Sequence, residues 1–366
     1  MSTQRPTTRP LTPNDVTASW LSTALQSSGV LPADTDVVSV RNESLGGGTG
    51  VFGVLARLVV QYSKPTSAPT QMVLKLPTTA PENKAVALAL GIYVRETNFF
   101  SELAARTPTA SVHCLYADMD IAAGEFVLIL EEIAHLEVGD QLSGANIAQL
   151  ELTLRQIAKW HAAWWLHPDL DIYDWLPTND SPIQMAVVPD IMRGAMPVIE
   201  SEWVSKLGQE AVSLGRDTTD KFEEILQRTG AAAKTLCHGD LRLENIFFND
   251  DATDMMMIDF QMVLKATPAQ DVQYLFNSSV EPDIWRSDGM RLLHLYHDEL
   301  LALGVSDYTW ATFWSEFQLQ CLWGMVAPAS TVAGFDMGDE KGKKLAERWM
   351  MRGWLLPTAV NAREVL

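Results

Sequence analysis

Hydrophobic and polar residues alternate in the first third of the chain, as they do in β-strands that have one buried face. Residues 51–62 show this two-residue period most clearly. A turn rich in Pro and Ser at 64–69 follows, and then a second apolar run at 72–76, so we predict a β-hairpin. The residues expected on one face of its first strand are Phe52, Val54, Ala56, Leu58, Val60 and Tyr62.

Other elements are expected around this hairpin. The segment from Thr12 to Asp15 has the composition of a helix start, and Trp20, Leu21 and Leu25 after it would form the apolar face of a short helix. Three more elements are expected in this part of the chain: a helix at 82–105, which Gly91 weakens, and strands at 112–117 and 125–130.

Beyond residue 131 the apolar positions follow the period of helices. Between 147 and 164 they recur at spacings of three and four, which predicts an amphipathic helix. We expect His161 on its apolar stripe to be a buried, hydrogen-bonded residue rather than a catalyst, and the cluster of Trp160, Trp164 and Trp165 to belong to the core. Further helices are expected near 184–229, 284–325 and 338–355.

One strand-rich island, residues 234–260, interrupts these helices. Two apolar runs, 245–248 and 255–258, flank the polar residues 249–254, whose types are common in turns. This pattern predicts a small hairpin.

The composition is that of a globular protein. The chain has 366 residues, of which 47% are hydrophobic and 20% charged, and this length allows two or three domains of about 100–200 residues. The charge is −19, from 27 Lys and Arg against 46 Asp and Glu. Because so negative a surface repels phosphate backbones, we expect no nucleic-acid partner.

Cysteine usage and hydropathy suggest where the protein resides. The three cysteines, Cys114, Cys237 and Cys321, are too few and too scattered for a disulfide framework. The first ten residues contain no apolar signal segment, and no run approaches the about 18 apolar residues that a membrane span needs. We therefore expect a cytoplasmic protein with no membrane partner.

The two ends of the island carry side chains that suit phosphoryl transfer. Residues 238–245 read HGDLRLEN and residues 258–261 read IDFQ. Transfer of a phosphoryl group from a nucleotide needs a carboxylate at the attacking hydroxyl and oxygen ligands for Mg²⁺. Asp240, Asn245 and Asp259 supply this set, because one loop presents the first two and the hairpin returns the third. An isolated Asp is more often a turn cap, but the spaced combination favours the functional interpretation.

The pair Cys237-His238 suggests a cysteine or metal hydrolase as an alternative. Adjacent residues of a strand point to opposite faces, and no zinc-ligand spacing accompanies the pair. We regard this alternative as the weakest.

HGDLRLEN, IDFQ, and then Gln270, Asp271 and Tyr274 resemble the aminoglycoside phosphotransferase and choline kinase superfamily, particularly its ecdysteroid-kinase-like branch. The resemblance spans Gly46 to Tyr274. It implies an α+β, bilobal protein-kinase-like fold, with a small N-terminal lobe containing an antiparallel sheet at 1–131 and a larger helical lobe at 132–366. The roles that it implies are Asp240 as catalytic base, Asn245 and Asp259 as Mg²⁺ ligands, His238 as a loop-shaping residue and Asp271 as the anchor of the catalytic loop.

One residue departs from the aminoglycoside kinases. Gln261 follows Asp259-Phe260 where those enzymes tend to have Trp and then Glu, whereas the ecdysteroid-kinase-like branch tends to have this Phe-Gln. This difference shifts the expected acceptor away from aminoglycosides.

A glycine-rich segment near the front of the chain matches a nucleotide site. Residues 48–53 form a GxGxxG pattern, and the strand-like alternation after Gly50 favours a hairpin tip over a Rossmann turn. In kinases such a loop folds over phosphates, because Gly lets the backbone approach closely. The residues that would bind the nucleotide here are Gly48, Thr49, Gly50 and Gly53.

Lys75 lies on the strand predicted at 72–76. A lysine between apolar neighbours either reaches solvent or meets an anion, and in the kinase arrangement it meets the α- and β-phosphates. Its expected carboxylate partner is Glu96 on the following helix, with Glu102 as the competing candidate. By resemblance, Glu131-Glu132-Ile133 is the hinge between the lobes.

These residues predict a small-molecule kinase that uses ATP and Mg²⁺ to phosphorylate a hydroxyl group of a small acceptor. The alternative is a nucleotide-binding pseudokinase with a regulatory or interaction role. Every catalytic position that we can identify carries the competent residue type, which favours the enzyme.

Overall fold

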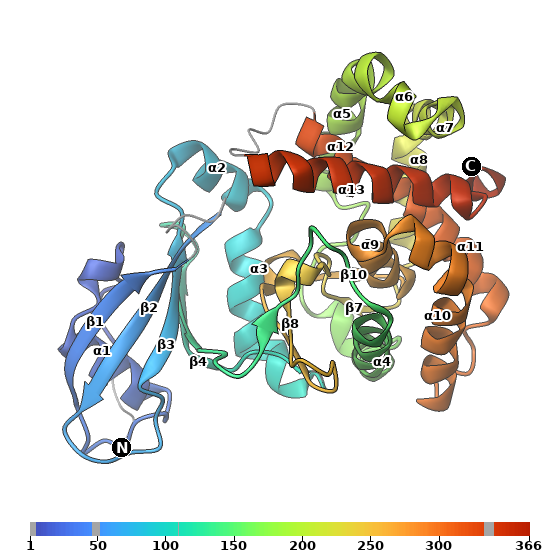
Figure 1. Cartoon of the computed structure of the whole chain (residues 1–366). Helices are drawn as coiled ribbons and strands as arrows, with labels where there is room; N and C mark the ends of the chain where they lie inside the picture. Colours follow the sequence, from blue (N-terminus) through green and yellow to red (C-terminus); the bar gives the residue numbers. More distant parts are fainter. Residues whose placement is uncertain (1–4, 46–51, 109, 333–339) are drawn as a thin grey trace. The chain divides into compact units, whose positions relative to one another are not determined.

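The computed structural model describes residues 5–45, 52–108, 110–332 and 340–366 (Figure 1). The chain divides into two compact units. The first comprises residues 1–106 and 111–135, and the second comprises residues 107–110 and 136–366. The predicted lobe boundary between residues 131 and 132 stays a prediction.

The first unit contains a five-stranded antiparallel sheet in the order β1-β2-β3-β5-β4. Its strands are β1 (Val37–Ser44), β2 (Gly53–Tyr62), β3 (Gln71–Pro77), β4 (Cys114–Asp120) and β5 (Glu125–Glu131). The predicted hairpin is thus β2 and β3, in which Leu55 lies opposite Lys75.

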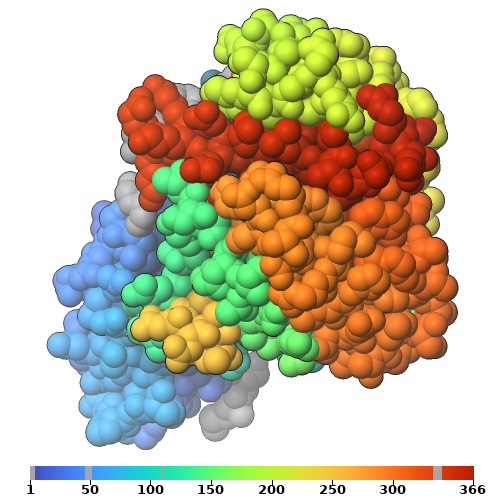
Figure 2. All heavy atoms as spheres, turned by 45° about the vertical axis from the view of Figure 1, so that its right-hand side comes forward, coloured from blue at the N-terminus to red at the C-terminus, as the bar shows by residue number. Residues whose placement is uncertain are grey.

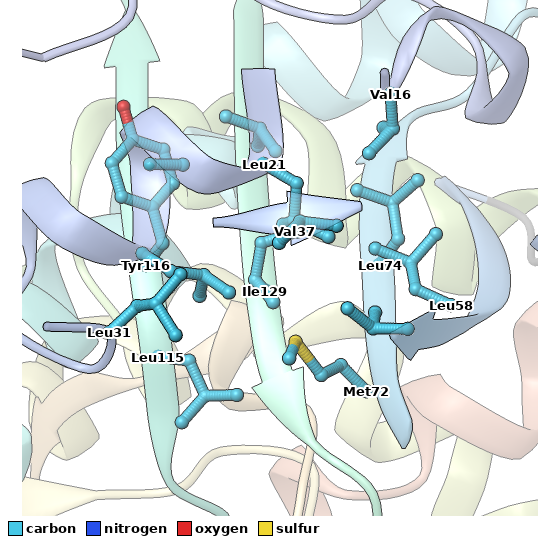
Figure 3. Packing of buried hydrophobic residues seen from close by; sticks show 14 of the residues in the cluster. Val16, Leu21, Leu31, Val37, Leu58, Met72, Leu74, Leu115, Tyr116 and Ile129 are labelled. Carbon is cyan, nitrogen blue, oxygen red and sulfur yellow. The ribbon is translucent and has the colours of Figure 1, made fainter. Parts of the chain in front are cut away.

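One face of this sheet packs against helix α1 (Ala18–Ser27), and the alternation in β2 explains why. Ala56, Leu58 and Val60 are buried, as the two-residue period predicts. In Figure 3 the side chains of Leu21 from α1, Leu58 and Leu74 gather in one cluster, to which Ile129 of β5 and Tyr116 of β4 belong. Lys75 and the opposite Leu55 are outside this cluster, on the other face.

The helices of this unit differ in part from the expected ones. A short 3₁₀ turn, Pro13–Asp15, stands where we expected α1 to start, because the Asp15 carboxylate accepts the amides of Leu11 and Thr12 and closes the turn. The helix begins at Ala18 instead, where the Thr17 hydroxyl accepts the amide of Trp20 at 3.1 Å.

The helix expected at 82–105 is divided. Gly91, with φ +66°, separates α2 (Pro81–Ala89) from α3 (Ile92–Asn98). A π-helical turn at Phe99–Leu103 and a 3₁₀ turn at Ala104–Arg106 follow. Gly91 therefore ends the first helix, as its weakening effect on the pattern suggested.

The second unit is mainly helical. Its helices are α4 (Ile147–Ala163), α5 (Pro182–Val198), α6 (Val204–Leu207), α7 (Gln209–Asp220), α8 (Phe222–Ala231), α9 (Ala269–Ser279), α10 (Pro282–Ala302), α11 (Trp310–Trp323), α12 (Val326–Val332) and α13 (Glu340–Ala359). Helix α4 is the predicted amphipathic helix, and Asn146 with Gln149 forms a capping box at its start. In Figures 1 and 2, α13 (red) lies across this unit between the yellow-green helices α5–α8 and the orange helices α9–α11.

The second unit also contains two small antiparallel sheets of short strands. The predicted small hairpin is β8 (Ile246–Phe248) with β9 (Met255–Met257), and β6 (Glu137–Val138) adds a third strand beside β8. A separate pair consists of β7 (Thr235–Cys237) and β10 (Leu264–Ala266). The predicted α+β architecture, an antiparallel sheet followed by a helical part, is confirmed. Among the described residues, no helix combines the length and the apolar character that crossing a bilayer requires.

Truncation of Leu58 tests the core of the first unit. Leu58 is 0% exposed, so Leu58→Ala should lower the free energy of unfolding by about 2–5 kcal/mol through lost burial and the remaining cavity. Urea denaturation measures this loss. Val38→Ala, at a β1 residue that is 56% exposed, is the control and should change stability by less than about 1 kcal/mol. Equal losses in the two variants would contradict the packing described here.

Candidate active site

The loop that carries HGD is held by one buried carboxylate, that of Asp271 in the first turn of α9. Its Oδ2 accepts the backbone amide of His238 at 2.7 Å, and its Oδ1 accepts the amide of Gly239 at 2.9 Å. His161 of α4 contacts Oδ2 through Nε2 at 3.1 Å. Asp271 is 0% exposed. The anchoring role that the resemblance implied for Asp271 therefore corresponds to direct hydrogen bonds.

These contacts determine the charge of Asp271. Burial alone would raise the pKa of its carboxyl, but the hydrogen bond and electrostatic attraction of His161, together with the amide of Gly239, hold that pKa below its ordinary value. His161 is itself fully bonded, because its Nδ1 lies 2.6 Å from the Tyr296 hydroxyl. The prediction that His161 is a satisfied buried histidine is confirmed.

Gly239 is required by the shape of the loop. Its φ is +80°, and a Cβ at this position would lie 2.1 Å from the carbonyl oxygen of Met262. Both facts exclude a side chain, since a positive φ is costly for L-residues and the close atom belongs to the backbone.

His238 joins the two ends of the island. Its Nε2 lies 3.0 Å from the carbonyl oxygen of Ile258, and its Nδ1 lies 3.3 Å from the amide nitrogen of Asp240. A carbonyl can only accept and an amide can only donate, so the ring carries its proton on Nε2. His238 thereby holds the backbone next to both Asp240 and Asp259, as a loop-shaping residue would.

Asp240 and Asn245 contact each other directly. The Nδ2 of Asn245 donates to the backbone oxygen of Asp240 at 2.9 Å and to its Oδ2 at 3.0 Å. Asn245 ends a 3₁₀ turn, Leu243–Asn245, and is 4% exposed. Because the amide nitrogen is used in these bonds, the Asn245 Oδ1 is the atom available to a metal ion.

Asp259 is brought to the same loop by the β8-β9 hairpin. The amide of Ile258 donates to the carbonyl of Asn245 at 3.0 Å, next to the paired residues Ile246 and Met257. Asp259 has φ +66°, an unusual conformation for a residue other than Gly, and its Oδ2 accepts Gln261 Nε2 at 3.1 Å. The structure thus gathers the three predicted residues of the island, and their donor atoms are the oxygen ligands that Mg²⁺ prefers.

Two residues beside Asp240 were not assigned a role from the sequence. Arg242 lies with Nε 3.4 Å from Asp240 Oδ1, and Asp240 raises the pKa of Arg242 above its ordinary value. Burial and the Asp240 carboxylate raise the pKa of Tyr274 well above its ordinary value. Both side chains therefore lie within the electrostatic reach of Asp240. In the sequence, the only sign that Arg242 would lie near Asp240 was its position two residues further along the same loop.

In the first unit, Lys75 and Glu96 form the predicted ion pair. Lys75 Nζ lies 2.7 Å from Glu96 Oε2 and 2.8 Å from Oε1. The Glu96 side chain is 1% exposed and that of Lys75 is 12% exposed, whereas Glu102 is exposed. The geometry thus selects Glu96 over its competitor as the partner of Lys75, while the role of the pair toward a nucleotide stays a prediction.

The predicted glycine loop is described only in part. Gly48, Thr49 and Gly50 lie outside the described residues. Gly53 is described: it is buried at the start of β2, opposite Pro77. The carbonyl of the preceding Phe52 accepts the Tyr93 hydroxyl at 2.9 Å, which ties the end of the segment to α3.

The hydrolase alternative lacks a suitable nucleophile. Cys237 is fully buried. Its burial, and to a smaller extent the negative charge of the nearby Asp271, raise the pKa of its thiol well above the ordinary value. His161, Cys237 and Asp271 lie close together, but His161 and Asp271 are already bonded to each other. Trp160 and Trp164 are buried, as expected, whereas Trp165 is only partly buried.

Comparison with protein families identifies the chain. The model of the ecdysteroid kinase-like family matches residues 47–304, so the chain belongs to this family. No curated protein sequence matches significantly.

Solved structures agree at the level of the fold. APH(2″)-IIia, solved as a complex with GDP and kanamycin, has a TM-score of 0.50 at 16% identity, with 94% of this chain and 98% of that chain covered. An aminoglycoside phosphotransferase from Alicyclobacillus acidocaldarius has a TM-score of 0.51 at 12% identity, with 88% and 91% covered. The predicted protein-kinase-like fold is therefore confirmed.

Alanine at Gly239 tests the strained loop. Gly239→Ala should destabilise the protein by about 1–2 kcal/mol through its positive φ, and by about 1–3 kcal/mol more through overlap with the Met262 carbonyl. Gly304→Ala is the control, because Gly304 has φ +98° with no atom within 4 Å of an added Cβ. Urea denaturation compares the two free energies of unfolding. A Gly239 variant that is no less stable than the Gly304 variant would refute the described backbone contact.

Proposed function

We propose that this member of the ecdysteroid kinase-like family transfers the γ-phosphate of ATP to a hydroxyl group of a small molecule, with Mg²⁺ as cofactor. The observation that carries the proposal is the contact between Asp240 and Asn245. This contact uses the Nδ2 of Asn245, so its Oδ1 can face a metal ion with the Asp240 carboxylate beside it. The hairpin brings Asp259 to the same loop.

In this proposal Asp240 receives the proton of the attacking hydroxyl. A bond forms between the acceptor oxygen and the γ-phosphorus, the bond from that phosphorus to the β,γ-bridging oxygen breaks, and ADP leaves with the electron pair. Asn245 and Asp259 would hold the metal ion, which supplies neutralisation of phosphate charge. Asn245 also orients Asp240 through its Nδ2.

Lys75 would bind the phosphates of the nucleotide. Glu96 is almost completely buried beside it and fixes the position of the ammonium group. By the same proposal, the glycine segment from Gly48 to Gly53 covers the phosphates. The partners are then a nucleotide and a small hydroxylated acceptor. The charge of −19 disfavours nucleic acid and anionic membranes as partners, and the three scattered cysteines fit the proposed cytoplasmic location.

Replacement of Asp240 tests the catalytic base. Asp240→Asn should lower kcat by about 10²- to 10⁴-fold, because the amide keeps the shape but cannot accept a proton. The dissociation constant of MgATP should change by less than about threefold. ADP release against a panel of hydroxylated metabolites measures the first quantity, and titration calorimetry measures the second.

Two further variants complete this test. Asp250→Asn makes the same charge change at an exposed turn residue and should retain activity. Asp259→Asn should instead weaken MgATP binding, because it removes a charged metal ligand. Wild-type turnover in Asp240→Asn would exclude the base, and MgATP binding without turnover on any acceptor would favour the pseudokinase.

Lys75 and the two glutamates on the following segment give a second test. Lys75→Met should strongly lower turnover of the folded protein, because its charge is proposed to act on phosphates. It should also lower the melting temperature, since the buried Glu96 carboxylate loses its partner. Glu96→Gln should reproduce part of this loss, whereas Glu102→Gln should resemble the wild type. Unchanged activity in Lys75→Met, or a larger loss in Glu102→Gln than in Glu96→Gln, would contradict the assignment.

A further inference from the structure

The catalytic loop is also held by a side chain outside its motif, that of Gln141. Its Oε1 accepts the backbone amide of Leu243 at 2.8 Å, and its Nε2 donates to the carbonyl of Ser278, in α9, at 2.5 Å. Leu243 begins the 3₁₀ turn that ends at Asn245. The first amides of such a turn have no partner inside it, so Gln141 satisfies one that would otherwise be buried without an acceptor.

No water can readily replace this bond. Gln141 is 4% exposed and Leu243 is 1% exposed. A buried amide that loses its acceptor keeps the full cost of its desolvation. The conformation of the turn between Asp240 and Asn245 therefore depends on the position of Gln141.

Gln141 is in turn fixed by Arg352 of α13. The Nη1 of Arg352 donates to the carbonyl oxygens of Gln141 at 2.7 Å and Ser278 at 2.6 Å. Its Nη2 donates to the carbonyl of Leu142 at 3.1 Å, and Nε and Nη2 both contact the Glu281 carboxylate. These five bonds match the five N–H donors of a guanidinium group, and the side chain is 1% exposed.

The segment around Gln141 packs closely on the same loop. The amide of Gly139 donates to the carbonyl of Ile246 at 2.9 Å. A Cβ on Gly139 would lie 2.9 Å from the carbonyl oxygen of Leu243. The backbone of Gly139 thus lies close to the Leu243 carbonyl, while the Gln141 side chain accepts the Leu243 amide.

Helix α13 also contacts α9, which carries Tyr274 beside Asp240. Trp349 Nε1 donates to Asn277 Oδ1 in α9 at 3.1 Å, and its ring contacts that of Tyr274 with centroids 6.3 Å apart. Trp349 and Arg352 are three residues apart and share one face of α13. Figure 2 shows α13 beside the orange helices to which these contacts are made.

We infer that Gln141 is a positioning residue for the reaction, which aligns Asp240 and Asn245 through the Leu243 amide, and that Arg352 holds Gln141 in place. This inference rests on the proposed function. Displacement of a catalytic group by about 1 Å can cost about 10²-fold in rate. Loss of the Gln141 bonds should therefore reduce kcat more than it weakens binding of MgATP, because Asp259, Lys75 and Glu96 keep their own contacts.

The test compares Gln141→Met with Gln318→Met. Gln318 is also a buried glutamine of the second unit, and its Nε2 donates to the carbonyl of Val360 at 2.8 Å. Both variants remove a buried amide of similar size, so both should lower the melting temperature. Only Gln141→Met should also lower kcat, by about tenfold or more, while the KM for MgATP changes by less than about threefold.

Two other readouts separate positioning from general stability. Hydrogen exchange of a peptide spanning residues 239–246 should become faster in Gln141→Met and not in Gln318→Met. Gln141→Glu keeps an oxygen for the Leu243 amide but loses the donor to Ser278, so its kcat should lie between those of wild type and Gln141→Met. Arg352→Lys, which keeps the charge and loses most of the bonds, should resemble Gln141→Met if it folds.

The outcomes are distinguishable. Equal kcat in the two Met variants, or unchanged hydrogen exchange at 239–246 in Gln141→Met, would overturn the inference. Absence of turnover in the wild type on every acceptor would instead refute the proposed function, and the hydrogen-exchange comparison would still decide whether Gln141 fixes the turn.

Discussion

The buried carboxylate of Asp271 is the interaction on which the candidate site depends. It accepts two consecutive backbone amides of the loop that carries Asp240, and it contacts His161. Removing one partner of a buried charge is costly, about 3–5 kcal/mol, so the loop has no inexpensive alternative conformation. The depressed pKa of Asp271 means that the ionised form is favoured in the folded state. The stability that it contributes is present at neutral pH and is lost as the pH falls through the acid range.

From this anchor the positions of the other groups follow in steps. Gly239, whose amide donates to this carboxylate, has a positive φ and leaves no room for a Cβ beside the Met262 carbonyl. His238 then faces Ile258, and this contact sets the backbone beside Asp259. Asn245 completes the arrangement by donating to the backbone oxygen of Asp240. Each step uses a backbone group, so side-chain identity matters mainly at the few residues that bridge the segments.

The sequence was informative where a local pattern reports the structure. The alternation in 51–62 predicted β2, because one face of that strand meets the core and the other does not. Helix α9 was missed because all eleven of its residues are buried although six of them are polar, so burial in this helix does not follow the polarity of the sequence. Strand β1 was missed for the opposite reason, since it is mostly exposed. Spacing identified Asp240, Asn245 and Asp259, but nothing local marks Gln141, which is 102 residues from Leu243 in the chain.

The proposed reactive charges already have opposite partners in the structure. Lys75 is paired with the buried Glu96, and Asp240 lies beside Arg242. A paired charge attracts a ligand less strongly than an isolated one, but it is held in one geometry before the ligand arrives. Because preorganised charges need no rearrangement at the moment of reaction, a site of this kind obtains its rate from alignment. Alignment of Asp240 in turn depends on buried backbone bonds to Asp271 and Gln141. The residues that set the rate would then include side chains that never touch the substrate.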